Sequence, residues 1–229
     1  MTSWSPTNRA VSAQRSELGL REQTFVFSCF NNNYKIIPPV FALWLRLMKR
    51  IEGIVLWLLR DNATAEANLR KEAAGHGIDP ARLVFAPRVK NEEHLARHRL
   101  GDLFLDTLPY NAHTTGSDAL WMGLPLVTCC GESFAGRVGS SLLHAVGLPE
   151  LVTTSLEEYE ALALKLATDG ELLRSIRRKL EANRTTAPLF DSARLCRHIE
   201  AAYQIMWERY RRGDPPVGFS VPPIPPRAR

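Results

Sequence analysis

The residues with the clearest capacity for chemistry lie in one short stretch, Asn111 to Asp118. This stretch follows an apolar run typical of a buried strand and precedes an apolar segment typical of a short helix, so it is expected at a strand-to-helix junction. In an open α/β sheet, ligands bind at such junctions. Thr114 and Thr115 would cap the helix, whose outward N–H groups and positive dipole end favour phosphate. Asp118, one turn further on, would accept hydrogen bonds from sugar hydroxyls.

The same spacing also has an explanation that requires no ligand. Thr115 and Asp118 fit a capping box, in which side chains near a helix start satisfy the N–H groups of its first turn. The stretch alone leaves both explanations open, and the surrounding chain has to decide between them.

The fold class follows from short apolar runs that alternate with helical segments. The runs are rich in aromatic, β-branched and leucine residues, and they predict six strands, at 24–30, 54–59, 82–86, 103–105, 126–128 and 151–152. Helical spacing predicts helices between the strands, including one over 91–100 and one from about residue 137. Nearly continuous apolar strands that alternate with helices are typical of an α/β fold with a doubly wound parallel sheet.

The chain divides into three parts. Residues 1–20 show no hydrophobic period and are expected to form a loose lead-in. Residues 21–213 hold the predicted sheet and, from residue 156 onward, helices only, of which the last carries an apolar stripe from Leu195 to Tyr210. Residues 214–229 are rich in proline and are expected to form an extended tail.

Composition narrows the class of protein. With 45% hydrophobic and 23% charged residues, the 229-residue chain is ordinary for a globular protein, and its net charge of +5 comes from scattered basic residues without a nucleic-acid motif. The first 20 residues lack an apolar signal core, and the longest apolar runs are far too short to span a bilayer. The spacing of the four cysteines matches no metal or redox motif, which predicts reduced thiols. We therefore expect a cytoplasmic protein without a nucleic-acid or membrane partner.

Polar residues that follow three of the predicted strands are expected to meet at one edge of the sheet. Asn32 and Lys35 follow the first strand, His94 follows the third, and His113 opens the stretch after the fourth. Lys35 offers a mobile positive charge suited to a phosphate. The sequence has neither a glycine-rich nucleotide fingerprint nor an Asp-x-Asp pair for a divalent metal. The charge of a diphosphate leaving group would then be stabilised by Lys35 and the helix N-terminus.

Several motifs, in the same order along the chain, resemble the protein O-linked N-acetylglucosamine (O-GlcNAc) transferase family. They are Phe30–Ile36, Val55–Arg60, Glu92–His94, Leu105–Thr107, His113–Trp121, Gly123–Thr128, Ser133–Val138 and Met206–Glu208. The resemblance extends from about residue 17 to residue 218. It implies a GT-B architecture with two Rossmann-like lobes, of which this chain is similar to the C-terminal, donor-binding lobe.

The resemblance assigns the phosphate side of a donor site. Lys35 resembles a lysine that contacts the diphosphate and is needed for catalysis, and Asn32 stands near the phosphates. His113, as a second catalytic residue, matches the diphosphate and sugar cradle together with Thr114 and Thr115. Asp118 matches the residue that contacts the ribose.

The resemblance also assigns a base side. His94 resembles a histidine that packs on the uracil ring, Arg97 an arginine near the base edge, and Val89 a residue whose backbone contacts uracil. The animal enzymes of the family have Pro-Lys directly before Glu-Glu-His, whereas this chain has Lys90-Asn91, so the lysine is displaced by one position.

The implied activity is transfer of N-acetylglucosamine, with inversion, from UDP-N-acetylglucosamine to Ser or Thr hydroxyls of an acceptor protein, without a metal or other cofactor. The resemblance does not extend to the N-terminal catalytic lobe or to the tetratricopeptide repeats of the family. We therefore expect a partner lobe, a repeat protein or self-association. Two alternatives stay open: a nucleotide-sugar-binding module without catalysis, and a GDP-fucose donor, which plant relatives with similar motifs use.

Overall fold

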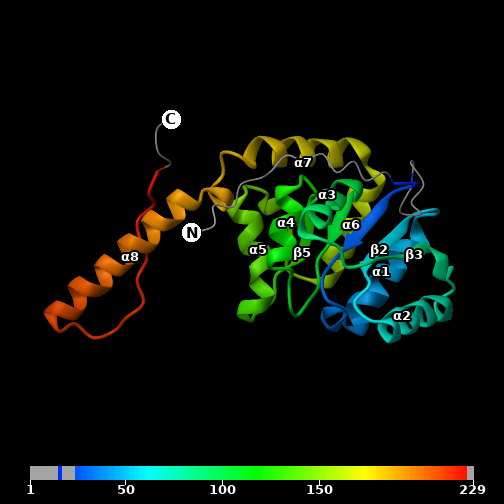
Figure 1. Cartoon of the computed structure of the whole chain (residues 1–229), viewed down its shortest axis with the longest axis horizontal. Coiled ribbons are helices and arrows are strands. Elements are labelled where there is room, and N and C mark those ends of the chain that lie inside the picture. The colour runs from blue at the N-terminus through cyan, green and yellow to red at the C-terminus, as the bar shows by residue number, and fades with distance from the viewer. Residues whose placement is uncertain (1–14, 17–23, 226–229) are drawn as a thin grey trace.

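A parallel sheet of six strands forms the centre of the molecule (Figure 1). The computed structural model describes residues 15, 16 and 24–225. The strands are β1 (Val26–Cys29), β2 (Val55–Leu59), β3 (Leu83–Ala86), β4 (Leu103–Leu105), β5 (Leu126–Cys129) and β6 (Val152–Thr153). Their spatial order is β3-β2-β1-β4-β5-β6, and every neighbouring pair is parallel. The predicted doubly wound, Rossmann-like α/β fold is confirmed.

Helices cover both faces of the sheet. They are α1 (Pro38–Arg50), α2 (Ala63–Gly75), α3 (Asn91–Arg97), α4 (Thr114–Trp121), α5 (Phe134–Ala145), α6 (Leu156–Thr168), α7 (Gly170–Asn183) and α8 (Ser192–Arg212). Helices α1 and α6 pack together on one face, where the indole N–H of Trp44 donates to the hydroxyl of Tyr159 at 3.2 Å. Helices α4 and α5 pack together on the other face, as right-handed crossovers require for strands that continue in the opposite direction.

The first helix shows how the sequence sets this packing. Pro38 occupies the first turn of α1, where its missing N–H removes no hydrogen bond. The apolar residues that follow lie on the side of the helix facing the sheet, and Trp44 and Met48 are almost completely buried there. Burial of each large apolar side chain stabilises the fold by about 1.5–3 kcal/mol.

The strand order creates one special position on the sheet. From β1 the chain continues outward to β2 and β3, whereas from β4 it continues outward in the other direction to β5 and β6. The carboxyl ends of β1 and β4 therefore form the topological switch point, where open α/β sheets bind ligands. Asn32 and Lys35 follow β1, and His113 precedes α4 after β4, so the predicted site residues belong to this edge.

One predicted helix start was wrong, and another predicted helix ends in a different form. The helix predicted from residue 137 begins at Phe134, because Ser133 caps it and accepts a hydrogen bond from the N–H of Gly136 at 3.0 Å. The helix predicted over 91–100 ends at Arg97 and continues as a single 3₁₀ turn over His98–Leu100.

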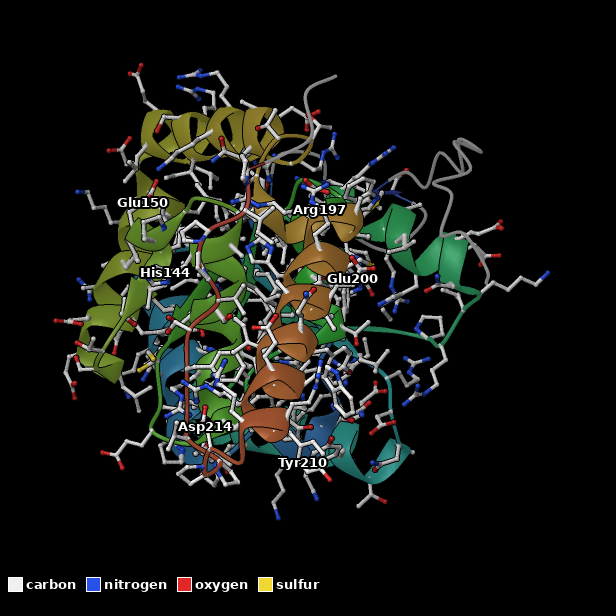
Figure 2. The ribbon with its side chains drawn as sticks, turned by 90° about the vertical axis from the view of Figure 1, so that its left-hand side faces the viewer. His144, Glu150, Arg197, Glu200, Tyr210 and Asp214 are labelled. Carbon is white, nitrogen blue, oxygen red and sulfur yellow. The ribbon has the colours of Figure 1, made fainter. Side chains whose placement is uncertain are left out.

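The last helix projects away from the sheet, and the chain then returns beside it (Figures 1 and 2). The guanidinium of Arg197 donates to the carbonyl of Pro225 at 2.8 Å, and the N–H of Ile224 donates to His198 Nε2 at 3.1 Å. None of the residues of α8 is buried. Its apolar residues stay exposed instead of packing on the sheet; they are Leu195, Ile199, Tyr203, Met206, Trp207 and Tyr210.

Three further expectations concern the N-terminal segment, the cysteines and the absence of a membrane span. The lead-in over residues 1–20 lies outside the described residues except for Arg15 and Ser16, and Arg15 pairs with Asp102 at 2.7 Å. All four cysteines are free, as predicted. No helix in the described part of the chain is long and apolar enough to cross a membrane.

Candidate functional site

A pocket of about 330 Å³ opens at the carboxyl edge of the sheet, close to the ends of β1, β2 and β3. Its volume lies in the range of small-molecule sites, about 300–1,000 Å³. The pocket is lined by Phe30, Asn32, Leu59, Arg88, Val89, Asn91, His94, Arg97 and Thr115. The structure thus brings together five of the predicted site residues from segments far apart in the sequence. They are Asn32, Val89, His94, Arg97 and Thr115.

Arg97 and His94 form one wall of this pocket. The guanidinium of Arg97 lies over the ring of Phe30, 4.6 Å from its centre, and donates to the carbonyl of Pro87 at 2.7 Å. The same guanidinium contacts His94 Nδ1. Because a guanidinium can only donate, Nδ1 is the acceptor, and the neutral imidazole carries its proton on Nε2. The His94 ring is thereby held in one orientation and one tautomer.

The charge states on this wall follow from burial. Desolvation, and then the positive charges of Arg97 and Arg88, lower the pKa of His94 to about 4. Desolvation lowers the pKa of Arg97 to about 10. Behind them, burial lowers the pKa of His98 to about 3, and this ring is fully buried. Near neutral pH the pocket therefore presents an uncharged imidazole beside a charged guanidinium.

The buried histidines make the fold sensitive to acid. The folded pKa of His98 lies below the unfolded value of about 6.5, so its stabilising contribution is complete above that pH and is lost as the pH falls. Between about pH 7 and pH 5, His98 alone should lower the free energy of unfolding by about 2 kcal/mol. Urea unfolding at both pH values should show a smaller decrease in His98→Asn than in the wild type. An equal decrease in both proteins would contradict the assignment; other titrating groups are common to both and cancel.

Lys35 lies at the switch point itself. It ends the 3₁₀ turn η2 (Asn33–Lys35) after β1 and is buried. Its ammonium donates to the carbonyl of Asn111 at 2.9 Å and stands 3.7 Å from the centre of the Tyr110 ring. The Tyr110 ring is also packed edge-on against His113, at 5.0 Å between ring centres. Lys35 and His113, the two predicted catalytic residues, therefore both contact the ring of one tyrosine.

Opposing effects set the charge on Lys35. Burial lowers its pKa, whereas the carboxylate of Asp106 raises it. The positive charge at the switch point thus depends on the carboxylate behind it.

The predicted capping roles of the two threonines were wrong. His113 occupies the N-cap of α4 without a side-chain hydrogen bond to the helix. Thr114, the first helical residue, is exposed, and the hydroxyl of Thr115 turns inward and donates to Asn31 Oδ1. The capping box of Thr115 with Asp118 is therefore not formed. The first-turn N–H groups of α4 have no acceptor within the helix, which leaves them directed at the edge of the sheet.

Asp118 lies one turn beyond Thr115 on the same side of α4. It is half-buried, and desolvation raises its pKa to about 6. Asp118, Thr114, His113 and Lys35 do not line the pocket; the first three belong to α4 or its N-cap, and Lys35 ends η2 after β1.

The sequence analysis assigned no role to the residues that hold these groups in place, although Asn111 opens the stretch on which it began. Asn31, Asp106, Thr107 and Asn111 are polar and almost completely buried behind the site. A usable signal exists for one of them, because the charged Asp106 comes directly after the wholly apolar Leu103–Leu105. For the others the sequence carries no comparable signal.

Comparison with known proteins places this chain in a family. The sequence model of glycosyl transferase family 41 matches residues 3–199. A probable UDP-N-acetylglucosamine–peptide N-acetylglucosaminyltransferase, SEC, of Arabidopsis thaliana is 40% identical over 209 residues, and the corresponding enzyme of Caenorhabditis elegans is 39% identical over 208 residues. Each match covers 91% of this chain but only 21% and 18%, respectively, of the relative. The chain thus spans about a fifth of the length of these relatives.

A solved structure agrees with the sequence matches. A mutant of the Thermobaculum terrenum O-GlcNAc transferase superposes with a TM-score of 0.79 at 34% identity, over 83% of this chain and 37% of that one. The sheet and helices described above therefore correspond to a lobe of a GT-B glycosyltransferase. By sequence and by fold, this chain belongs to glycosyl transferase family 41.

Proposed function

We propose that this chain binds UDP-N-acetylglucosamine as the donor-binding lobe of a protein O-GlcNAc transferase. The observation that carries the proposal is the convergence of polar side chains from three strand ends on one pocket, beside a buried lysine at the switch point. The relatives named above are N-acetylglucosaminyltransferases that act on peptides, which supports the choice of donor.

The phosphate side of the proposed site consists of Lys35 and the start of α4. The ammonium of Lys35 would leave the Asn111 carbonyl and bind diphosphate oxygens, and the first-turn N–H groups at Thr114 and Thr115 would donate to the same anion. Both groups would stabilise the charge that develops on the UDP leaving group. Asn32 and His113 border this position, and Asp118 would accept hydrogen bonds from the ribose.

The base side of the proposed site is the pocket wall around His94. The uncharged imidazole suits packing against a uracil ring, and the Arg97 guanidinium that fixes it would then lie near the base edge. The backbone of Val89, an exposed residue that lines the pocket, would contact uracil by hydrogen bonds. The size and chemistry of this wall would select the base.

The proposed reaction transfers the sugar, with inversion, to a Ser or Thr hydroxyl of a protein acceptor. In a GT-B enzyme the reaction takes place between two lobes, so we propose that an N-terminal lobe completes the site and that a tetratricopeptide-repeat segment presents the acceptor. We propose that the donor site needs no metal, since Lys35 and the helix start supply the positive charge.

Calorimetric titration of the purified chain with UDP and with GDP tests the donor assignment. Repeating each titration in the presence of the chelator EDTA tests the proposal that no metal is needed. UDP is expected to bind at least about tenfold more tightly than GDP, a difference of about 1.4 kcal/mol, and EDTA should change neither value. Tighter binding of GDP would favour the GDP-fucose alternative, which the displaced Lys90 beside the pocket makes worth testing. Sugar transfer by the chain alone would exclude the non-catalytic binding module.

The exposed stripe on α8 predicts association with another chain or lobe. An amphipathic helix without a buried residue leaves a large apolar surface in water, and Trp207 and Tyr210 stack at 5.7 Å within it. Light scattering at high protein concentration should show a mass above that of the monomer. Trp207→Glu should reduce the association, whereas Glu200→Gln on the same helix (Figure 2) should not. A wild type that stays monomeric throughout would contradict self-association.

A further inference from the structure

The buried carboxylate of Asp106 joins the ends of three central strands. It follows β4 directly and is 2% exposed. Its Oδ2 accepts a hydrogen bond from the hydroxyl of Thr128, near the end of β5, at 2.7 Å. Its Oδ1 accepts the N–H groups of Thr107 at 2.8 Å and Ala112 at 2.6 Å, and lies 3.4 Å from the side-chain nitrogen of Asn31, after β1. One side chain thus closes the loop 107–112, which ends directly before His113.

The loop closed by Asp106 carries the groups that face the proposed ligand. The backbone carbonyl of Asn111 accepts from Lys35. The side chain of Asn111 donates to the carbonyl of Thr107 at 2.7 Å and accepts from the N–H of Gly139 at 3.3 Å, which holds the residue in place. The ring of Tyr110 lies against the Lys35 ammonium, and the backbone carbonyl of Tyr110 accepts a hydrogen bond from the Thr107 hydroxyl at 2.7 Å. The position of Lys35 therefore depends on the conformation of this loop.

Asn31 extends the same network to the first turn of α4. Its side-chain nitrogen donates to the hydroxyl of Thr107 at 2.7 Å, and its side-chain oxygen accepts from the hydroxyl of Thr115. The direction of the Thr115 side chain is thereby tied to the loop that Asp106 closes. Lys35 and Thr115 approach the site from different strands, and both are fixed through this one buried cluster.

The charge of Asp106 is not required for packing. Burial raises its pKa to about 7, well above the ordinary value of 3.8, because desolvation disfavours the anionic form. An asparagine would fill the same space without that cost. The carboxylate offers what an asparagine does not: a negative charge behind Lys35, and two oxygens that both accept hydrogen bonds.

We propose that Asp106 is a positioning residue: it fixes the 107–113 loop and the charge of Lys35 so that the anion-binding groups stand ready before the ligand arrives. This inference rests on the proposed function for its consequence, nucleotide binding, but not for the loop structure itself. Asp106 acts from behind Lys35 and the loop and does not touch the ligand.

The other titratable groups that face Asp106 leave its titration easy to identify. They are Lys35 after β1, the thiol of Cys29 in β1 and the phenol of Tyr159 on α6; Gly139 of α5 and Thr128 of β5 also face Asp106, and neither titrates. Burial raises the pKa of the Cys29 thiol and of the Tyr159 phenol, so both stay neutral near pH 7. Lys35 is the charged member of this set.

Amide NMR signals of the ligand-free chain test the loop directly. In the wild type, the Thr107 and Ala112 signals should titrate together between about pH 6 and pH 8, because both N–H groups donate to the same carboxylate. In Asp106→Asn this titration should disappear, and hydrogen exchange of residues 107–113 should become about tenfold faster. Thr128→Val, which removes one hydrogen bond to the carboxylate, should move the midpoint to higher pH and serves if Asp106→Asn does not fold.

UDP titration then tests the consequence for the site. Asp106→Asn should bind UDP about tenfold more weakly than the wild type, with a flatter dependence on pH. The matched control is Tyr159→Phe, which removes a 3.0 Å hydrogen bond to the backbone carbonyl of Asp106 but leaves the carboxylate in place. This control should lower thermal stability while keeping loop exchange and UDP affinity.

The outcomes separate the two proposals. Unchanged loop exchange in Asp106→Asn, or unchanged Thr107 and Ala112 signals over the pH range, would overturn the positioning role whatever UDP does. Equal UDP affinity in Asp106→Asn and the wild type would also overturn it. The third outcome is that the wild type shows the titration and Asp106→Asn shows the faster exchange, but the wild type binds no UDP. That result would overturn the proposed donor and leave the positioning role of Asp106 intact.

Discussion

A Lys35→Met variant is expected to bind UDP about 100-fold more weakly than the wild type, because it loses about 2.7 kcal/mol of charge-assisted hydrogen bonding. Lys35 is the cation that the fold places at the switch point, and its ammonium already rests on a carbonyl that a ligand can replace. Methionine is of similar length and packs well against aromatic rings, so its side chain can remain beside Tyr110. The substitution therefore removes the charge and little else.

The fold of this variant should change little. Removing a buried ammonium relieves its desolvation cost, while the Asn111 carbonyl loses its donor, and these two effects oppose one another. We expect a change in the free energy of unfolding within about 1 kcal/mol. Calorimetric titration with UDP and urea unfolding measure the two effects separately.

The matched control for Lys35→Met is Lys49→Met. Lys49 lies in the last turn of α1, is exposed and carries the same charge. Its replacement should leave UDP affinity unchanged. A similar loss in both variants would mean that the net charge of the chain, and not the position of Lys35, governs binding; undiminished binding by Lys35→Met would remove this lysine from the proposed site.

Replacing Gly139 with alanine is expected to destabilise the fold by about 3 kcal/mol. A methyl group at this position of α5 would lie 2.5 Å from Asp106 Oδ2, 2.5 Å from the Thr128 hydroxyl and 3.0 Å from Thr128 Cβ. These neighbours belong to the centre of the sheet and to the buried hydrogen-bond network, so they cannot move aside as an exposed side chain would. Overpacking of a closely packed core typically costs about 1–3 kcal/mol, and here it also disturbs a buried carboxylate.

The control for Gly139→Ala is another helical glycine, Gly75. A methyl group there meets nothing within 4 Å, and the residue ends the exposed α2. Gly75→Ala should stabilise the protein by up to about 1 kcal/mol, since alanine has the higher helix propensity. Urea unfolding of both variants measures the difference directly. Equal and small effects in the two variants would contradict the close approach of α5 to Asp106.

The sequence predicted the strands because burial on both faces leaves a strong signal. Segments such as Ile54–Leu59 are apolar without interruption, as strands between two helical layers must be, and each predicted strand overlaps an observed one. The helix starts were less reliable. The helix predicted from residue 137 begins at the Ser133 cap, a local hydrogen bond that the apolar spacing does not reveal.

The site was predictable only as a set of positions. Strand ends in a doubly wound sheet must share one edge, and on that basis Asn32, His94 and Thr115 were expected near one another; all three line the same pocket. The direction of each side chain was not predictable. Thr115 has the residue type and position of a helix cap, yet its hydroxyl turns to Asn31, which is 84 positions earlier in the chain.

By itself, the sequence determined the α/β class, the parallel sheet, the family and the positions along the chain from which a ligand could be reached. Those features depend on local apolar runs, on turn residues and on motifs whose members are close in sequence. Only the tertiary structure decided that Asp106 and Asn31 meet behind the loop whose Asn111 carbonyl accepts from Lys35, and that α8 buries none of its residues. Both results depend on contacts between segments far apart in the chain, and the energy of such contacts is fixed by the packing of the whole sheet rather than by any local pattern.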